Sequence, residues 1–232
     1  MLSIIIPAWN EEKCLPVLLE CIKKQTYKDY EIVIADADSS DKTIYIAKKY
    51  GCKIVKGGFP AKGRNSGAKV AKGGIFIFLD ADVKIEKDFL RKAVKELSEK
   101  KLDCAGTYLK PQANNLTDSV FLEVFNIWIR MMQHIFPHAV GSAIFCRKSL
   151  HKKIKGFDES ITLAEDMDYV KRASKSGKFR ILKTVFLSYS MRRYEAEGRL
   201  KVIAKILMAG IYRVFFGEMK TDIFNYDLRY RK

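Results

Sequence analysis

The sequence predicts an α/β protein with a doubly wound, mostly parallel sheet. Short, continuously apolar runs alternate with helical patterns in the first half of the chain, as expected for parallel strands that are covered by helices on both faces. The chain has 232 residues, of which 48% are hydrophobic and 30% charged. That length and composition suit one such domain with a helical part toward the C-terminus.

Four strands and four helices are predicted in the first half. The first strand covers residues 2–6, an apolar run that Pro7 closes. The later strands are predicted at residues 30–35, 53–55 and 75–79, and the helices at 11–24, 41–50, 63–72 and 87–100. The second half is predicted to contain helices at 118–136, 165–176 and 197–216, strands at 142–146 and 179–187, and a turn at 154–159.

The charge and the cysteines limit the class of protein. A net charge of +16 favours a polyanionic partner, such as nucleotide phosphates, an anionic lipid surface or nucleic acid, although a solvated surface also accounts for it. The five cysteines are scattered without a Cys-x-x-Cys pair, which predicts buried, reduced thiols in a cytoplasmic protein. We expect no signal peptide and no transmembrane helix, because no sufficiently long uncharged apolar run occurs.

Acidic and polar residues follow three of the predicted strands. Asp80 and Asp82 come directly after residues 75–79, Asp36 follows the second strand, and Glu11 comes soon after the first. In an open α/β sheet the carboxyl ends of parallel strands form the ligand-binding edge, so we expect these groups to converge. Two carboxylates this close favour a hard divalent cation, Mg²⁺ or Mn²⁺, whereas the plainer interpretation is a pair of solvated turn aspartates.

Three further segments admit two interpretations each. Asp36 can accept hydrogen bonds from a base or a ribose, while the turn that follows it also caps a helix. The segment Gly63-Arg64-Asn65-Ser66-Gly67 opens a helix that can attract anions, or its glycines allow close helix–sheet packing. Glu165 and Asp166 suit the first turn of a helix electrostatically, and one of them is a candidate catalytic base.

Taken in order, these segments resemble the family two glycosyltransferases. The opening Ile4-Ile5-Ile6-Pro7-Ala8-Trp9-Asn10-Glu11-Glu12 is similar to theirs, as are the Asp36 to Thr43 segment, Arg64-Asn65-Ser66-Gly67, Asp80-Ala81-Asp82, Gly156-Phe157-Asp158-Glu159 and Glu165-Asp166-Met167-Asp168. The resemblance covers about residues 1 to 180 and implies the GT-A fold. It also implies an inverting, metal-dependent sugar transfer from a nucleoside-diphosphate sugar to an acceptor hydroxyl.

The resemblance also implies roles for particular residues. Asp166 would be the general base, and Asp82 would ligate Mg²⁺ or Mn²⁺. The nucleotide sugar would contact Pro7, Ala8, Glu11, Asp36, Arg64, Asp80 and Arg193. Arg193 belongs to the Arg192-Arg193-Tyr194 segment, which would close over the diphosphate or else form basic surface.

The sequence departs from the family pattern at three points. Ala37 replaces an expected Asp, Asp38 stands where Gly is common, and no histidine follows Tyr189 as a late metal ligand. The three histidines lie in the middle of the chain and are expected to be ordinary partly buried or surface residues.

The resemblance divides the chain into a catalytic domain and a tail. Residues 1–195 would form the catalytic domain, with a nucleotide-sugar half at 1–100 and an acceptor half at 101–195. Residues 196–232 would form an amphipathic helical tail. The acceptor would be a glycan or lipid-linked. The apolar helices at 118–136 and 197–216 are interpreted as core or a homodimer interface, slightly ahead of peripheral contact with the anionic cytoplasmic face of a membrane.

Three rival functions are weaker. A dolichyl-phosphate sugar synthase would share the fold and donor, but the expected glycine-rich loop is replaced by Arg64-Asn65-Ser66-Gly67. A sugar-phosphate nucleotidyltransferase needs a Gly-x-Gly-x-Arg loop after the first strand, which is missing. A nucleic-acid-binding protein is suggested by charge alone, so we expect no nucleic-acid partner.

Overall fold

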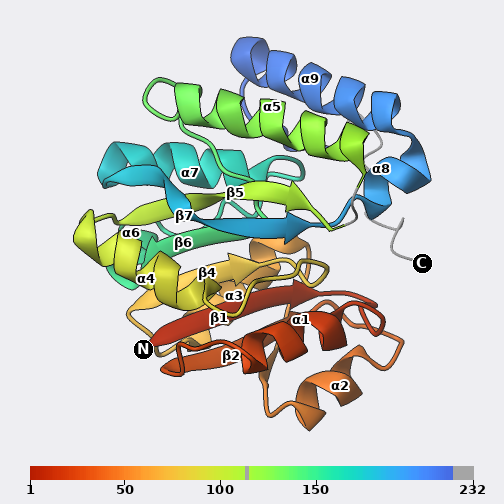
Figure 1. Ribbon diagram of the computed structural model, residues 1–232, viewed down its shortest axis with the longest axis vertical. Helices are drawn as coiled ribbons and strands as arrows, with labels where there is room; N and C mark the ends of the chain where they lie inside the picture. The colour runs from red at the N-terminus through yellow and green to blue at the C-terminus, as the bar shows by residue number, and fades with distance from the viewer. Residues whose placement is uncertain (113–114, 222–232) are drawn as a thin grey trace.

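The structure is a computed structural model that describes residues 1–112 and 115–221 (Figure 1). Within the last helix, the side chains of Leu207, Ile211 and Val214 lie outside the described part. The predicted tail of residues 196–232 is therefore described only as far as residue 221, and its last part lies outside the described residues.

Seven strands form one sheet with the order β3-β2-β1-β4-β6-β5-β7. The strands are β1 (Leu2–Ala8), β2 (Tyr30–Asp36), β3 (Lys53–Lys56), β4 (Ile75–Leu79), β5 (Cys104–Pro111), β6 (Ala143–Arg147) and β7 (Phe179–Tyr189). β6 is antiparallel to both of its neighbours, β4 and β5, and the other neighbouring pairs are parallel. The predicted mostly parallel, doubly wound α/β sheet is confirmed.

Helices cover both faces of the sheet (Figure 1). They are α1 (Leu15–Lys23), α2 (Thr43–Lys49), α3 (Pro60–Val70), α4 (Phe89–Glu99), α5 (Leu116–Met132), α6 (Lys148–Lys153), α7 (Glu165–Ser176), α8 (Arg192–Glu197) and α9 (Arg199–Phe216). The central strand β4 serves both layers: Ile77 and Leu79 pack with α1 and α4, while Phe76 and Phe78 pack with α3, α6 and α7. Its unbroken apolar sequence follows from burial on both faces.

The sequence did not predict β5, α6 or α8. β5 contains the small residues Ala105 and Gly106 and lacks the apolar run that marks the other central strands. Gly106 is required there because an added Cβ would lie 2.5 Å from the Cβ of Ala139. The expectation that all cysteines are buried is wrong for Cys14, Cys21 and Cys52, which are half-buried, and right for Cys104 and Cys146.

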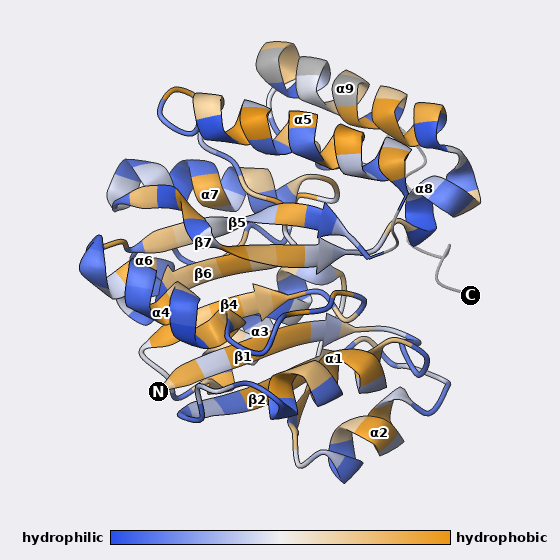
Figure 2. Ribbon diagram, viewed as in Figure 1, coloured by the Kyte–Doolittle hydropathy of each residue, from blue (hydrophilic) through white to orange (hydrophobic). Residues whose placement is uncertain are grey.

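The interpretation of α5 as core holds for only part of the helix. Leu122 and Ile129 are buried, but Leu116 and Met131 are 81% and 70% exposed, and so is Ile135 (81%), which follows the end of the helix. An apolar face is therefore left in contact with solvent along α5 and the neighbouring α9, at one end of the molecule (Figures 1 and 2). Within the described residues, no helix has both the length and the apolar character needed to cross a bilayer.

His151 makes the fold sensitive to acid. Its ring packs among Phe76, Phe78 and Phe157, its Nδ1 lies 2.9 Å from the hydroxyl of Tyr169, and burial lowers its pKa to about 4. The unfolded chain therefore binds a proton below the ordinary pKa of 6.5, whereas the folded chain does not. Stability is lost as pH falls from 6.5 to about 4, and this one group accounts for up to about 3 kcal/mol.

We expect the His151→Gln variant to lose part of this pH dependence when the free energy of unfolding is measured by urea denaturation between pH 7 and pH 4. The His134→Gln variant is the matched control because His134 is exposed. Equal pH slopes in the wild type and both variants would show that His151 does not set the acid limit.

Candidate functional site

The ends of β1, β2 and β4 meet at one edge of the sheet, as the sequence predicts. Ala8 is paired with Asp36 across β1 and β2, and the turns that follow these strands are joined by hydrogen bonds. The backbone N–H of Asn10 donates to Ser39 Oγ at 2.9 Å, and that of Glu11 donates to Thr43 Oγ1 at 2.8 Å. Pro7, Ala8, Glu11 and Asp36 are therefore fixed in one rigid corner.

Asp36 stabilises its own turn. Its Oδ1 accepts a hydrogen bond from Ser39 Oγ at 2.6 Å and its Oδ2 accepts one from Ser39 N at 3.0 Å. These bonds close the turn after β2, while the first residue of α2 is bound by Asp41, whose Oδ1 accepts a hydrogen bond from Thr43 N at 2.9 Å. Contact of Asp36 with a base or ribose stays a prediction. Asp38 has a φ of 60°, in the left-handed region that favours glycine, so the chain makes at this position the turn for which the family pattern uses Gly.

Arg64 connects three parts of the chain beneath this edge. It lies in α3 with its side chain 3% exposed. Its Nη1 donates to Glu165 Oε1 at 2.6 Å, and its Nη2 donates to Asp80 Oδ1 at 3.1 Å and to the carbonyl of Gly141 at 3.2 Å. Burial alone would lower the pKa of Arg64, but Glu165 and Asp80 outweigh it and the pKa is raised. The placement favours a positioning role, and direct contact with a donor stays a prediction.

Asp80 is held from two sides. Ser142 Oγ donates to its Oδ2 at 2.8 Å, while Arg64 binds its Oδ1. Because Ser142 directly precedes the antiparallel strand β6, the chain reaches this edge from the opposite direction to β4. The carboxylate therefore has a fixed orientation before any ligand arrives.

Asp166 lies at the start of α7, next to the same cluster. Its Oδ2 accepts a hydrogen bond from the backbone N–H of Gly141 at 2.6 Å, and its Oδ1 accepts one from Met167 N at 2.8 Å. Burial raises the pKa of Asp166, which Arg64 and the Gly141 N–H only partly oppose. Burial also raises the pKa of Glu165. A carboxylate whose pKa is raised toward neutral pH suits a general base.

Two backbone features place Asp166. Ala164, directly before α7, has a φ of 62°, a strained conformation for a residue with a Cβ, and this turn directs the first residues of the helix inward. Gly141 leaves no room for a side chain, because an added Cβ would lie 2.9 Å from both Arg64 Nη2 and Asp166 Oδ2. The close contact between Gly141 and Asp166 thus depends on glycine.

Asp82 and Glu11 are both contacted by the guanidinium group of Arg192, from the C-terminal part of the chain. Arg192 Nη2 lies 2.8 Å from Asp82 Oδ2 and 3.4 Å from Glu11 Oε2. The side chains of Asp82 and Glu11 are 14% and 1% exposed. Arg193, which the sequence analysis selected, instead has its Nε 2.9 Å from Glu197 Oε1. The structure therefore brings Arg192 rather than Arg193 to the two acidic side chains.

The Gly63 to Gly67 segment lies inside α3, which begins at Pro60, so the expectation that it opens a helix and attracts anions there is wrong, whereas the expected close packing is found. An added Cβ at Gly67 would lie 2.4 Å from Ile5 Cγ2, so this glycine allows α3 to pack closely on β1. Asn65 fixes the loop that follows α6: its Nδ2 donates to Phe157 O and its Oδ1 accepts from Phe157 N, both at 2.9 Å. Only Arg64 of this segment reaches the acidic cluster.

The site offers few protein ligands to a metal. Within residues 1–112 and 115–221, no group of three or more His, Cys, Asp or Glu side chains is arranged to hold an ion. Asp80 is engaged by Arg64 and Ser142, so both of its oxygens have protein partners, whereas Asp82 is contacted through Oδ2 by Arg192. This fits a hard cation that is held by one carboxylate and completed by phosphate oxygens, because Mg²⁺ is commonly bound in that way.

Sequence reasoning missed Gly141, Ser142 and Gln112 as contributors to the site. Gln112 supports Asp82 by donating from Nε2 to its backbone carbonyl at 2.6 Å. The sequence did point to the basic Arg192-Arg193 pair, but it did not show which of the two arginines contacts the acidic side chains. Gly141 and Ser142 carried no motif that would have marked them.

Comparison with known proteins agrees with this arrangement. The profile of Glycosyl transferase family 2 matches residues 3–154, so the chain belongs to this family. The poly(ribitol-phosphate) beta-N-acetylglucosaminyltransferase TarS of Staphylococcus aureus is 26% identical over 97% of this chain and 41% of its own length. The amylovoran biosynthesis glycosyltransferase AmsB of Erwinia amylovora is 28% identical over 82% of this chain and 69% of its own.

Solved structures share the GT-A fold with this chain. The mannosyltransferase PcManGT of Pyrobaculum calidifontis, in complex with GDP-Man and Mn²⁺, matches with a TM-score of 0.70 at 19% identity over 89% of this chain and 64% of its own. Residues 1–349 of S. aureus TarS, in complex with UDP-GlcNAc, match with a TM-score of 0.66 at 22% identity over 82% of this chain and 58% of theirs. The present chain thus spans about two-fifths of full-length TarS. The predicted GT-A fold and family are confirmed.

Proposed function

We propose that this chain transfers a sugar from a nucleoside-diphosphate sugar to an acceptor hydroxyl, with inversion at the anomeric carbon. The observation that carries the proposal is the Asp166 carboxylate, buried against the Gly141 N–H, joined through Arg64 to Asp80 at the carboxyl edge of the sheet, and given a raised pKa by its burial. Family membership and neighbours with bound UDP-GlcNAc and GDP-Man support a nucleotide-sugar donor.

Each site residue has a separate role in the proposed reaction. Asp166 takes the proton of the acceptor hydroxyl while the oxygen attacks the anomeric carbon from the side opposite the diphosphate. The new C–O bond forms as the bond to the diphosphate oxygen breaks, and the electron pair leaves with the diphosphate. A single displacement of this kind inverts the anomeric centre. Asp80 and Arg64 orient the donor and the base, and Pro7, Ala8, Glu11 and Asp36 hold the nucleoside.

Asp82 is proposed to hold the divalent ion. Mg²⁺ or Mn²⁺ there would neutralise the charge that develops on the leaving diphosphate. Mn²⁺ is present in two neighbouring structures, PcManGT and GalNAc-T7, and this supports a divalent ion without deciding which one. Arg192, which contacts Asp82 and Glu11, is suitably placed to meet the same phosphates, and Arg193 acts beside it in closing the C-terminal segment.

The acceptor is proposed to be a glycan or a lipid-linked glycan. One relative is named a poly(ribitol-phosphate) beta-N-acetylglucosaminyltransferase, and another a 4,4'-diaponeurosporenoate glycosyltransferase. The exposed apolar face of α5 and α9 supports peripheral contact with an anionic, cytoplasmic membrane surface more than a homodimer. Two copies that each carry a net charge of +16 repel one another, whereas an anionic surface attracts them.

The metal-dependent donor site is tested by thermal shift. We expect UDP or GDP with Mn²⁺ at about 100 times Kd to raise Tm by roughly 5–10 °C, with no rise from RNA or DNA. The Asp82→Ala variant should keep its fold, lose most of the metal-dependent rise, and lose about 10²-fold or more in kcat/KM because the leaving charge is no longer stabilised.

Asp29→Ala is the matched control, because Asp29 is exposed and lies at the opposite edge of the sheet, directly before β2. An undiminished Mn²⁺ response in Asp82→Ala would remove Asp82 from this role. Screening sugar nucleotides by their slow hydrolysis would identify the donor, and the configuration of the product would test inversion.

A further inference from the structure

A basic cavity lies beside the proposed active site. It has a volume of about 350 Å³ and is formed where the end of α5, the outward side of α7 and the start of β7 meet. Its lining includes Gln133, Phe136, Lys171, Lys175, Lys178 and Arg180. This volume is near the lower end of the roughly 300–1,000 Å³ that small-molecule sites occupy. No residue assigned above to the donor, the metal or the base lines it.

The lysines of the cavity form one stripe along α7 and its end. Lys171 and Lys175 are four residues apart and so lie on the same side of α7, while Lys178 follows the helix, which ends at Ser176, and lines the same cavity. Like charges at this spacing destabilise a helix. Because these lysines face the cavity, they give it a positive potential that attracts an anion.

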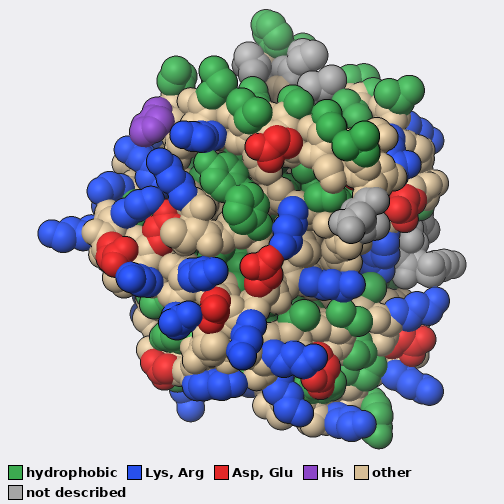
Figure 3. Space-filling view, in the orientation of Figure 1, with side chains coloured by type: hydrophobic (Ala, Val, Ile, Leu, Met, Phe, Trp, Pro, Cys, Tyr) green, Lys and Arg blue, Asp and Glu red, His purple; other side chains and the backbone are tan. Residues whose placement is uncertain are grey.

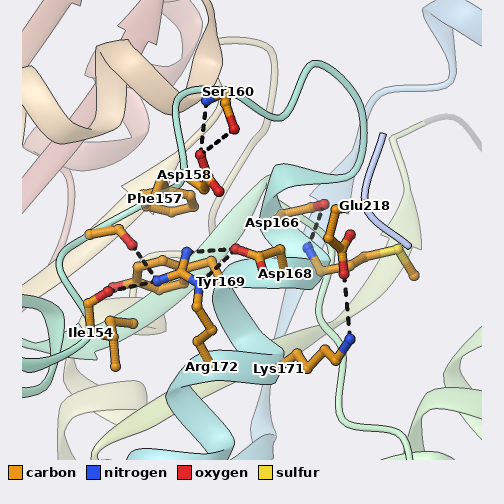
Figure 4. Close-up of polar contacts among 12 residues, drawn as sticks. Ile154, Phe157, Asp158, Ser160, Asp166, Asp168, Tyr169, Lys171, Arg172 and Glu218 are labelled. Atoms are coloured by element: carbon orange, nitrogen blue, oxygen red, sulfur yellow. Dashed lines mark hydrogen bonds and ion pairs between the residues drawn. The ribbon is translucent and has the colours of Figure 1, made fainter. Parts of the chain in front are cut away.

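The neighbouring groups neutralise these charges only in part. Glu218 contacts Lys171, with Nζ and Oε1 3.5 Å apart, and also Arg213, which lines the cavity as well (Figure 4 shows the contact with Lys171). Among the described residues, Lys175, Lys178 and Arg180 form no ion pair with an acidic side chain.

The basic groups keep donors for a ligand. Lys178 Nζ donates to the carbonyl of Lys100 at 2.9 Å, and Arg180 Nη1 donates to that of Phe179 at 2.6 Å. A lysine ammonium has three donors and an arginine guanidinium has five, so each retains donors beyond these contacts. The carboxylate of Asp103 accepts the backbone N–H of Lys178 at 2.8 Å rather than its ammonium group.

The rim of the cavity is apolar on one side. Ile135 and Phe136 line it and are 81% and 42% exposed, and they continue the apolar face of α5. Figure 3 shows the row of apolar side chains over α5 next to a gathering of Lys and Arg over α6 and α7. A phosphate attached to a carbon chain matches both parts, with its oxygens on the basic stripe and the chain along the rim.

We infer that this cavity binds a phosphate group of a phosphate-bearing ligand, separately from the donor site. Met167 lines the cavity and directly follows Asp166, so the basic stripe begins where the base is placed. Resting on the proposed function, the ligand is the acceptor or its carrier. The phosphate belongs either to a polyol-phosphate chain or to a lipid headgroup.

The test compares two double variants with the same change in charge. The double variant Lys171→Gln/Lys175→Gln removes two positive charges from the stripe. The double variant Lys48→Gln/Lys49→Gln removes two positive charges from the exposed end of α2, at the far side of the molecule. Binding of a glycerol-phosphate oligomer is measured by calorimetry with UDP or GDP and Mn²⁺ present to fill the donor site. Co-sedimentation with phosphatidylglycerol–phosphatidylcholine vesicles forms the second arm.

We expect the wild type and the α2 variant to bind within twofold of one another, and the α7 variant to bind at least about tenfold more weakly, because two charge-assisted contacts are lost. Binding of the oligomer alone identifies a polyol-phosphate chain, and binding of vesicles alone identifies a lipid headgroup. Equal losses in both variants, or no binding in either arm, would overturn the inference. The thermal shift with nucleotide and Mn²⁺ reports separately on the donor site, so it can succeed where this inference fails.

Discussion

The Asp166→Asn variant should keep its fold and lose about 10²–10⁴-fold in kcat, which is the usual contribution of a positioned general base. The amide has nearly the same shape as the carboxylate, and its oxygen can still accept the Gly141 N–H. The bond from Met167 N is lost, but it lies within one turn of chain and is worth about 1 kcal/mol, so a loss of 10²-fold or more would reflect proton transfer. Single-turnover kinetics with a saturating nucleotide sugar would measure the chemical step.

Asp168→Asn is the matched control on the same helix. Asp168 faces Arg172, with its Oδ2 2.6 Å from Arg172 Nη2 (Figure 4). We expect this variant to retain activity within a few fold. Near-normal turnover in Asp166→Asn would assign the base to another group.

The pH profile gives a second readout for Asp166. Only the ionised carboxylate can accept a proton, so kcat should fall as pH drops through its pKa, which burial raises above the ordinary 3.8. The raised pKa of Asp166 also affects the stability of the fold, but here the favourable effect is found at low pH rather than at high pH. The folded chain keeps this proton over a pH range in which the unfolded chain has lost it, so the stabilising contribution is present at low pH and disappears as pH rises through the raised pKa.

The Arg64→Met variant should show the largest loss of stability. It removes a buried cation and leaves the carboxylates of Glu165 and Asp80 without it, a change that typically costs about 3–5 kcal/mol. For a chain of this length such a loss would lower Tm by roughly 10 °C. Calorimetry would measure it, and Arg91→Met on the exposed side of α4 is the matched control, because its side chain is 61% exposed.

The pH dependence of the stability loss in Arg64→Met distinguishes a loss of charge interactions from a loss of packing. Arg64 lowers the pKa values of Glu165 and Asp166, so its removal raises both further. The folded variant then takes up protons more readily, and its deficit in stability should shrink as pH falls. A deficit that does not change with pH would assign the loss to packing alone.

Much of the fold follows from local patterns. The run Ile75-Phe76-Ile77-Phe78-Leu79 is apolar at every position because β4 is covered on both faces, and that pattern is visible without a structure. β5 could not be found in this way, because it fits against Ala139 through Gly106 rather than through large side chains. Its position depends on a contact between distant parts of the chain, which no local pattern reports.

The positions of site residues could be predicted where the order and direction of the strands determine them. They could not be predicted where the direction of an individual side chain determines which residue makes a contact. The rule for parallel strand ends brought Asp36, Asp80 and Asp82 to one edge. Arg192 and Arg193 are neighbours in the short helix α8, and successive helical residues point about 100° apart, so only one of them reaches Asp82. The sequence contains no signal that decides between them.

The reversed direction of β6 has a consequence for how acceptor specificity can diversify. Because β6 runs against β4, the turn before it arrives at the very edge where β4 ends, and it carries Gly141 and Ser142 to Asp166 and Asp80. We therefore expect that the connection from α5 into β6 can be replaced by another loop while β1, β2 and β4 stay unchanged. Grafting experiments that preserve Gly141 and Ser142 should be tolerated more readily than any change in the strands themselves.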